Sequence, residues 1–545
     1  MWMQNRIASK IIIIAIIVSG LFISFNVLKK NHEEVSGEKS TDSEEGWKAD
    51  ISPITFDWYI DYPGFMTKWG NNVVSNYVTK KTGVSIKFIA PSEDEEEKLK
   101  DMIQKNELPD FVTLSSWNDE YRSIIKENLA LPLDRLAEQY DTYFFKVTDK
   151  QKLEWYKESD GYTYCYPNFS LDIKDTKDYK EENPSNQTFL VRKDIYEAIG
   201  KPDMRTPEGF LNALEKAKEK FSNINKEPLI PLGLDEFNNS GNLSLDSILP
   251  NFLAIPFEKE GKIYERITDP EYIKWLRTLR KANELGLISK DIFQDKRTQM
   301  GEKIAKGRYF SMLYQRTDII EEQLELYKTD KNKIYIPVDG PANSKLDEPK
   351  LASNSISGWK VTLISKGCKN PERAIKFLSY LISEEGNKDL YLGEKDITWK
   401  YIKGREQFKP ELRNLLNDNR KIFYEKYGAE KTYWMLMDTN LINKWANTES
   451  EALKILEDWP RGKTYNFSIY DKTAPYGDIE EGKAYSKIQH KWKNTLKSLL
   501  IANSDDEFDR ILNEFLTYRE GEGYEKIQIY RQRKFEENKK KLNIE

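Results

Sequence analysis

The chain is poor in two side chains on which much enzyme chemistry depends, because its 545 residues contain only two histidines and two cysteines. The histidines, His32 and His490, are far apart in the sequence. Two histidines cannot build a histidine-rich metal site, and they argue against a Ser-His-Asp triad. No glycine-rich phosphate loop is present either. These absences argue against nucleophilic, zinc-dependent and phosphoryl-transfer enzymes.

An excess of positive charge is also lacking, since the net charge is −5, and this argues against a nucleic-acid partner. Carboxylates are abundant, with 90 Asp plus Glu. In so large a set, two carboxylates at the spacing of a glycosidase will occur by chance, so their number is not evidence for one. A membrane-anchored glycosidase stays an alternative, but we expect a protein that is not an enzyme.

The two cysteines, Cys165 and Cys368, leave two possibilities open. In an exported protein they can pair, but the sequence does not show whether they lie close together. Two separate buried thiols are the alternative that we favour.

The N-terminus carries a basic head and then an apolar run of eighteen residues, Ile11 to Leu28. A helix of this length spans roughly 27 Å, enough to cross a bilayer. A cleaved secretory signal has a similar head and core, but bulky residues such as Phe25 and Val27 leave no small-x-small cleavage site. We predict an uncleaved membrane anchor over residues 1–30, followed by an acidic, disordered tether over 31–50.

Strand and helix patterns alternate in the next part of the chain. We expect strands at 54–58, 84–88 and 111–114, with helical spacing over 66–81 and 92–103 between them. This order predicts a parallel sheet with right-handed crossovers, in which ligands bind beyond the carboxyl ends of the strands.

The residues at or just after the first and third of these strands are candidates for a binding cleft: Trp58, Tyr59, Asp61, Trp117 and Asn118. Aromatic rings cover the apolar face of a sugar, while Asp and Asn bond its hydroxyls. Each has another interpretation. Trp58 shares a strand face with Phe56 and can pack in the core, and Asp61 can simply end a turn. The 13 Trp and 31 Tyr likewise suit either sugar-binding or interface surfaces, or the cores of large lobes.

The second half repeats this organisation. A strand at 189–191 precedes a helix at 194–199, another strand at 309–313 ends before Tyr314 and Gln315, and Trp359 begins a strand that alternates through Val361. Beyond residue 410 the pattern is helical, with long runs at 484–502 and 504–540. The chain is too long for one core, so we expect at least two lobes and a helical tail.

Several short motifs occur in a fixed order along most of the chain: Glu107-Leu108-Pro109-Asp110, Gly161-Tyr162-Thr163-Tyr164, Val191-Arg192-Lys193-Asp194, Gly358-Trp359 and Pro371-Glu372-Arg373-Ala374. With these motifs the chain resembles the family 1 extracellular solute-binding proteins of carbohydrate ABC importers. The resemblance extends to the long branch that includes alginate-oligosaccharide-binding proteins.

The resemblance implies an α/β fold of the type II periplasmic-binding-protein kind, with two lobes, hinge crossings and a helical C-terminal extension after the anchor. The first lobe would hold 51–182 and 353–420, and the second 183–352 and 421–545. It implies an extracellular, monomeric component of a Gram-positive ABC importer. Such a protein captures an oligosaccharide in the cleft between the lobes and delivers it to a membrane permease.

The resemblance also implies further ligand-binding residues: Tyr166 and Asn168 beside the first crossing, Tyr314 and Gln315 in the second lobe, Trp359 at the second crossing, and Trp399. Tyr166, Tyr314 and Trp399 suit core packing equally well.

The chain departs from the family pattern at two places. It lacks the N-terminal cysteine that carries lipid in Gram-positive relatives, so either the apolar helix replaces the lipid or the protein is a sensing ectodomain that partners a membrane kinase. Where alginate binders have a calcium loop, residues 222–228 are short, lack glycine and offer one carboxylate, Glu227. Calcium needs six to eight oxygen ligands, so we predict no metal and no cofactor.

Overall fold

The computed structural model describes residues 45–63, 65–92, 95, 97–172, 183–238, 241–446 and 450–544. The predicted anchor and most of the predicted tether lie outside these residues. Among the helices that are described, none is both long enough and apolar enough to cross a bilayer.

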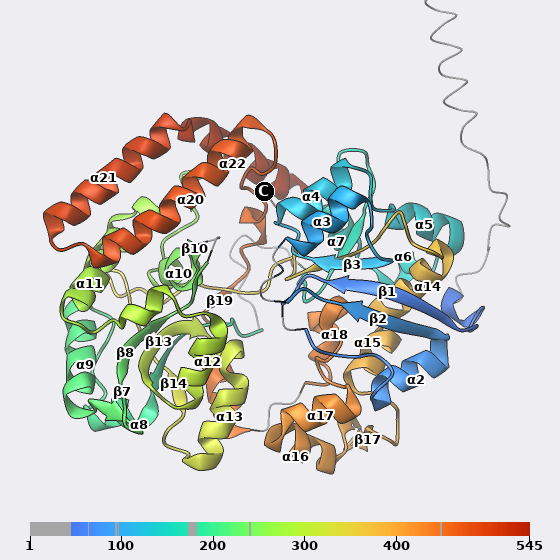
Figure 1. The fold of residues 1–545 in the computed structure, drawn as a ribbon, viewed down its shortest axis with the longest axis horizontal. Coiled ribbons are helices and arrows are strands. Elements are labelled where there is room, and N and C mark those ends of the chain that lie inside the picture. The colour runs from blue at the N-terminus through green and yellow to red at the C-terminus, as the bar shows by residue number, and fades with distance from the viewer. Residues whose placement is uncertain are drawn as a thin grey trace, which may run out of the picture. The chain divides into compact units, whose positions relative to one another are not determined.

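The first sheet has the strand order β2-β1-β3-β16-β4 (Figure 1). Its strands are β1 (Ile54–Ile60), β2 (Val84–Ile89), β3 (Phe111–Leu114), β4 (Cys165–Pro167) and β16 (Val361–Ile364). β1 pairs in parallel with β2 and β3, and β16 is antiparallel to β3 and β4. The predicted parallel strands are therefore confirmed, and the chain returns to them near residue 361.

The helix after β1 begins later than the sequence predicts. We expected it from residue 66, but α2 covers Val73–Thr82. Asn72 caps its N-terminus by accepting a hydrogen bond from the Ser75 N–H at 3.0 Å, which fixes the start of the helix there. Gly83 ends it in the left-handed conformation, with φ 73°.

The second sheet has the order β14-β5-β13-β8. Its strands are β5 (Gln187–Arg192), β8 (Ile230–Leu234), β13 (Tyr309–Gln315) and β14 (Tyr335–Pro337). Helices α9 (Pro207–Lys220) and α11 (Pro270–Glu284) pack beside it, and each begins with proline after a capping Thr206 or Asp269.

Further helices fill the connections: α3 (Lys98–Lys105), α4 (Asp119–Lys126), α5 (Leu133–Tyr140), α6 (Phe144–Val147), α7 (Lys150–Tyr156), α8 (Lys193–Ala198), α10 (Leu249–Phe252), α12 (Arg297–Ala305), α13 (Ile320–Thr329), α14 (Pro371–Ile382), α15 (Glu384–Tyr391), α16 (Pro410–Asp418), α17 (Arg420–Tyr427), α18 (Thr439–Ile442) and α19 (Glu451–Asp458). Short hairpins β6–β7 (223–224, 227–228), β9–β10 (237–238, 241–242), β11–β12 (258–259, 262–263) and β17–β18 (399–402, 405–408) complete the fold.

Each sheet has its own hydrophobic core. The core of the first sheet includes Phe423, Met435 and Trp445, so this segment packs with the first lobe, whereas we expected residues from 421 onward in the second. Within this core Trp445 lies beside Tyr391 of α15, with 5.9 Å between the ring centroids. The second core takes in Trp492 and Phe515 of the helical tail.

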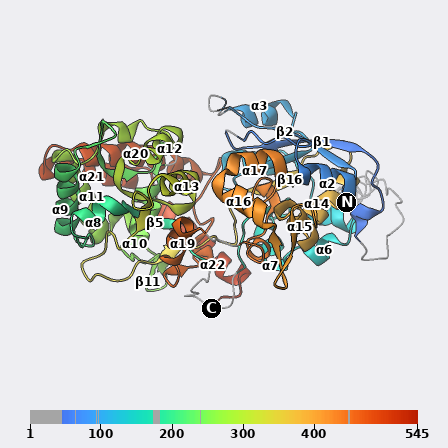
Figure 2. The same cartoon turned by 90° about the horizontal axis from the view of Figure 1, so that it is seen from below.

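The tail consists of α20 (Glu480–Ile501), α21 (Asp505–Gly521) and α22 (Tyr524–Lys541), coloured orange to red in Figures 1 and 2. The long run predicted over 504–540 is broken at Gly523, whose φ of 86° no α-helix accommodates.

Segments that connect the two sheets are hydrogen-bonded to one another. β15 (Leu351–Ala352) pairs in parallel with β19 (Thr464–Tyr465). Ser185 joins both, because its hydroxyl donates to the Ala352 carbonyl at 2.6 Å and its N–H donates to Thr464 Oγ1 at 3.0 Å. These contacts bring residues 185, 352 and 464 together between the sheets.

Candidate functional site

The strand register gathers several polar residues at one edge of the first sheet. Val361 of β16 pairs with Leu114 of β3 and with Pro167 of β4. The residues just beyond these three positions, Lys360, Ser115 and Asn168, therefore meet at the edge where the parallel strands end. Asp61, which follows β1, joins them through its N–H, which donates to the Thr113 carbonyl at 2.8 Å.

A buried lysine organises this edge. Lys360 Nζ donates to the Asp61 carbonyl at 2.6 Å and to Ser115 Oγ at 3.2 Å. Burial lowers the pKa of Lys360, and the negative charge of Asp61 opposes this shift. Burial also raises the pKa of Asp61. Asn168 bonds through both ends of its amide, since its Oδ1 accepts from the Lys360 N–H at 2.7 Å and its Nδ2 donates to the Trp434 carbonyl at 3.2 Å. Its side chain thus holds the edge together.

Four aromatic side chains form a cluster at the same edge: Tyr62, Phe65, Trp359 and Trp434. The Trp434 ring centroid lies 4.7 Å from that of Trp359, 5.8 Å from that of Tyr62 and 6.0 Å from that of Phe65. Tyr62 and Trp359 are 42% and 38% exposed. The cluster therefore presents aromatic surface to solvent beside polar groups, an arrangement suited to a ligand with both apolar and hydroxylated faces.

Only Trp359 of this cluster was among the predicted site residues. Tyr62 and Phe65 follow β1 and could have been found by the same strand-end argument that selected Asp61. Trp434 carries no comparable signal, because it comes from a 3₁₀ turn (Trp434–Leu436) more than 70 residues after Trp359.

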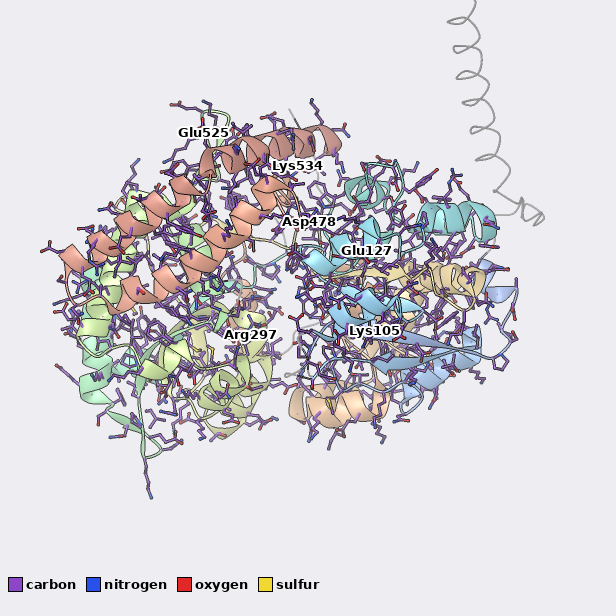
Figure 3. The ribbon with its side chains drawn as sticks, turned by 45° about the horizontal axis from the view of Figure 1, so that its top comes forward. Lys105, Glu127, Arg297, Asp478, Glu525 and Lys534 are labelled. Atoms are coloured by element: carbon purple, nitrogen blue, oxygen red, sulfur yellow. The ribbon has the colours of Figure 1, made fainter. Side chains whose placement is uncertain are left out.

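A cavity of about 160 Å³ lies near the start of α4. It is lined by residues of the β3–α4 connection, of the segment before β16 and of the loop after residue 470: Ser116, Trp117, Arg122, Ser355, Ser357, Gly358, Asp471, Lys472 and Tyr476. Trp117 is 44% exposed. An ion pair of 2.8 Å between Lys126 of α4 and Asp478 holds the loop against the helix, and Figure 3 shows Asp478 near Glu127 at the end of α4.

Burial shapes the ionisation of groups around this cavity. It lowers the pKa of Lys472 to about 7, and its Nζ lies 3.4 Å from the Tyr156 ring centroid. Burial raises the pKa of Asp471, and hydrogen bonds with the Ser355 and Ser357 hydroxyls oppose that rise. Cys165 is a buried free thiol whose pKa burial raises to about 12, and Cys368 is a second buried free thiol.

Four predicted site residues are enclosed in the first lobe. Trp58 donates from Nε1 to Thr113 Oγ1 at 2.8 Å and stacks on Phe111 at 4.8 Å. Tyr59 is buried, Tyr166 is buried with its pKa raised to about 12 by desolvation, and Trp399 donates from Nε1 to the Gly393 carbonyl at 2.8 Å. The structure does not bring these four rings into the exposed cluster.

The remaining predicted residues lie apart from the cluster. Asn118 is the half-buried residue before α4, and its side chain makes no capping bond. In the second lobe Tyr314 is buried, which raises its pKa, and Gln315 is half-buried at the end of β13. Near Tyr314, Arg297 bridges Asp235 and Asp318, at 2.7 Å from each.

The segment that we expected to hold no metal is the β6–β7 hairpin. Its one carboxylate, Glu227, pairs with Lys306 at 2.9 Å and Arg308 at 2.7 Å. Among the described residues, no group of three or more His, Cys, Asp and Glu side chains is arranged to hold a metal ion.

A family model for bacterial extracellular solute-binding proteins matches residues 74–399, more than half of the chain. No curated protein sequence matches the chain.

Solved structures of similar fold match 89–90% of the chain. The alginate-binding protein AlgQ2 without calcium ion is similar with a TM-score of 0.65 and 17% identity, over 89% of this chain and 98% of that one. The ABC-transporter substrate-binding protein FusA of S. pneumoniae, in complex with kestose, gives 0.64 and 16%, over 89% and 99%. The N-glycan transport solute-binding protein NgtS of Streptococcus pneumoniae gives 0.55 and 16%, over 90% and 99%. At these identities the likeness establishes the fold.

Proposed function

This chain belongs to the bacterial extracellular solute-binding proteins, and from that premise we propose that it captures an oligosaccharide for a membrane ABC importer. As a member of this family it binds a solute and is not an enzyme. The ligand would lie against the edge of the first sheet, between the two lobes, and a membrane permease would receive it.

The aromatic cluster is the observation that carries the carbohydrate assignment. Tyr62 and Trp359 expose ring surface, and the half-buried Trp434 packs against both of these rings. A pyranose ring has an apolar C–H face that stacks on such rings and a rim of hydroxyls that needs polar partners. The similar structures include an alginate-binding protein, a substrate-binding protein in complex with kestose and an N-glycan transport protein, which supports the same class of ligand.

Capture would depend on a change in lobe arrangement. A ligand that contacts both lobes binds the closed state more tightly than the open one, and this difference in affinity shifts the population toward closure. The hydrogen-bonded segments near residues 185, 352 and 464 are the natural place for the bending. The closed protein would then dock on the permease and release the sugar unchanged. The N-terminal apolar run would hold the protein at the outer face of the membrane.

The carbohydrate assignment is tested by thermal shift against a panel of neutral and acidic oligosaccharides. A ligand that binds only the native state raises the melting temperature with concentration. Trp359→Ala should lose about five-fold or more in affinity, because stacking on one aromatic side chain, as known for nucleic-acid bases, is worth on the order of 1–3 kcal/mol. Tyr401→Ala is the matched control, since Tyr401 is an exposed ring in the β17–β18 hairpin outside the cluster. An equal response of both variants and the wild type would remove the cluster from the site.

A further inference from the structure

The cavity beside α4 has a different chemistry from the aromatic cluster. Its lining includes two basic side chains, Arg122 and Lys472, and one carboxylate, Asp471. The whole chain has a net charge of −5, so a cavity with an excess of basic groups is a local exception to the charge of the protein.

Neither basic group has an ion-pair partner within the described part of the chain. Arg122 Nε is buried without a hydrogen-bond partner, and its guanidinium lies 4.8 Å from the Tyr476 ring centroid. Lys472 Nζ lies over the Tyr156 ring. A buried N–H without an acceptor destabilises the protein, because it has lost its hydrogen bonds to water. A ligand oxygen that accepts a hydrogen bond from this N–H removes that cost, and this favours binding.

The nearby carboxylates are already engaged. The charge of Asp471 is stabilised by hydrogen bonds with the Ser355 and Ser357 hydroxyls. Glu158, which also acts on Lys472, accepts a hydrogen bond from the Tyr121 hydroxyl at 3.2 Å. The guanidinium of Arg122 is thus free to bind a planar anion through two parallel N–H donors.

We propose that this cavity is a subsite for the carboxylate of an acidic sugar unit, with Arg122 and Lys472 as its cationic partners. The cavity and the aromatic cluster adjoin along the chain, because Gly358 lines the cavity and the next residue, Trp359, belongs to the cluster. A uronic-acid unit in the cavity therefore places its neighbouring ring near Trp359. This inference rests on the proposed function and narrows its ligand to oligosaccharides that contain uronic acid.

The test compares pairs of ligands that differ in charge alone. Oligouronides of several backbones, two to six units long, are titrated into the full-length protein by calorimetry, each beside its carboxyl-reduced neutral counterpart. We expect at least one acidic member to bind ten-fold or more tightly than its neutral counterpart. Because the carboxylate stabilises the protonated amine of Lys472, binding at pH 8 should take up a proton, visible as a dependence of the measured heat on the buffer.

Variants assign the discrimination to the cavity. Arg122→Gln and Lys472→Gln should bring the affinity ratio of acidic to neutral ligand close to one, and Lys472→Gln should also abolish the proton uptake. Lys126→Gln removes a positive charge from the same helix outside the cavity and should keep the ratio. Neutral sugars that bind as tightly as their acidic forms would overturn the subsite and leave the proposed function intact. Failure of every oligosaccharide to bind would overturn both.

Discussion

At the residue scale, tryptophan serves both as a core residue and as an exposed ring at the first sheet. Trp58 lies within β1 and Trp359 just before β16, yet Trp58 is buried against Phe111 while Trp359 is 38% exposed. The strand-end argument places residues from different strands at one edge, because parallel strands end together. It does not separate a ring that faces the core from one that faces solvent, because that depends on which helices cover each face of the sheet.

Lys472 makes the stability of the protein depend on pH in a specific direction. Its pKa in the folded state is about 7, below the ordinary 10.5, so between these values the unfolded chain binds more protons. The free energy of unfolding therefore rises with pH across this window. The cause is burial, and the groups that act on the amine are Cys165, Glu158, Lys541 and Arg122.

We expect Lys472→Met to reduce this rise by about 1–2 kcal/mol between pH 7 and pH 9, since one pKa unit corresponds to about 1.4 kcal/mol. Denaturant unfolding of wild type and variant at several pH values measures it. Lys126→Met, which removes an exposed lysine of α4, serves as control. Parallel pH profiles for the wild type and Lys472→Met would contradict the assignment.

At the element scale, local signals account for several helix starts. Thr206, Asp269 and Asn370 each cap a helix that begins with proline. The same signals did not predict the packing of distant segments. Trp434 reaches the aromatic cluster, and residues 423–445 join the first core, through contacts between parts of the chain that no local pattern connects.

Asn72, which caps α2, also makes a contact with a residue that is distant in the sequence. Asn72 accepts from the Ser75 N–H and donates from Nδ2 to the Tyr433 hydroxyl at 2.7 Å. Tyr433 precedes Trp434 of the aromatic cluster and is itself buried.

We expect Asn72→Ala to lower the free energy of unfolding by about 2 kcal/mol, because it removes the cap and leaves the Tyr433 hydroxyl with one partner fewer. Asn72→Asp keeps the cap acceptor and should lose less. Chemical denaturation measures both. A loss below about 0.5 kcal/mol for Asn72→Ala would show that neither contact stabilises the fold.

At the scale of the whole molecule, the last helix connects the two cores. Ile527, near the start of α22, lies in the core of the second lobe, while Phe535 packs in a core of the first lobe and stacks on Tyr470 at 5.2 Å. α22 therefore contacts both lobes in addition to the segments that connect the sheets. The composition of the tail predicts its helices, but which surfaces they cover depends on both finished lobes.

Asn538 is the residue of α22 through which this connection is most directly tested. It is buried, and its Nδ2 donates to the Ile469 and Asp471 carbonyls at 3.0 and 2.7 Å, next to the cavity. Asn538→Ala leaves both carbonyls without this donor, so we expect the free energy of unfolding to fall by about 1–3 kcal/mol. Because the loop at Asp471 lines the cavity, binding of an acidic oligosaccharide should weaken while neutral members keep their affinity.

Asn513→Ala, an exposed asparagine of α21, is the matched control, and calorimetric unfolding with and without ligand is the measurement. If α22 couples the lobes, Asn538→Ala broadens or splits the unfolding transition, because each lobe then unfolds with less support from the other. A single sharp transition at an unchanged temperature, with ligand affinities equal to those of Asn513→Ala, would show that α22 merely covers the surface of the lobes. A broadened transition together with weaker binding of the acidic ligand would instead show that α22 helps to position the ligand.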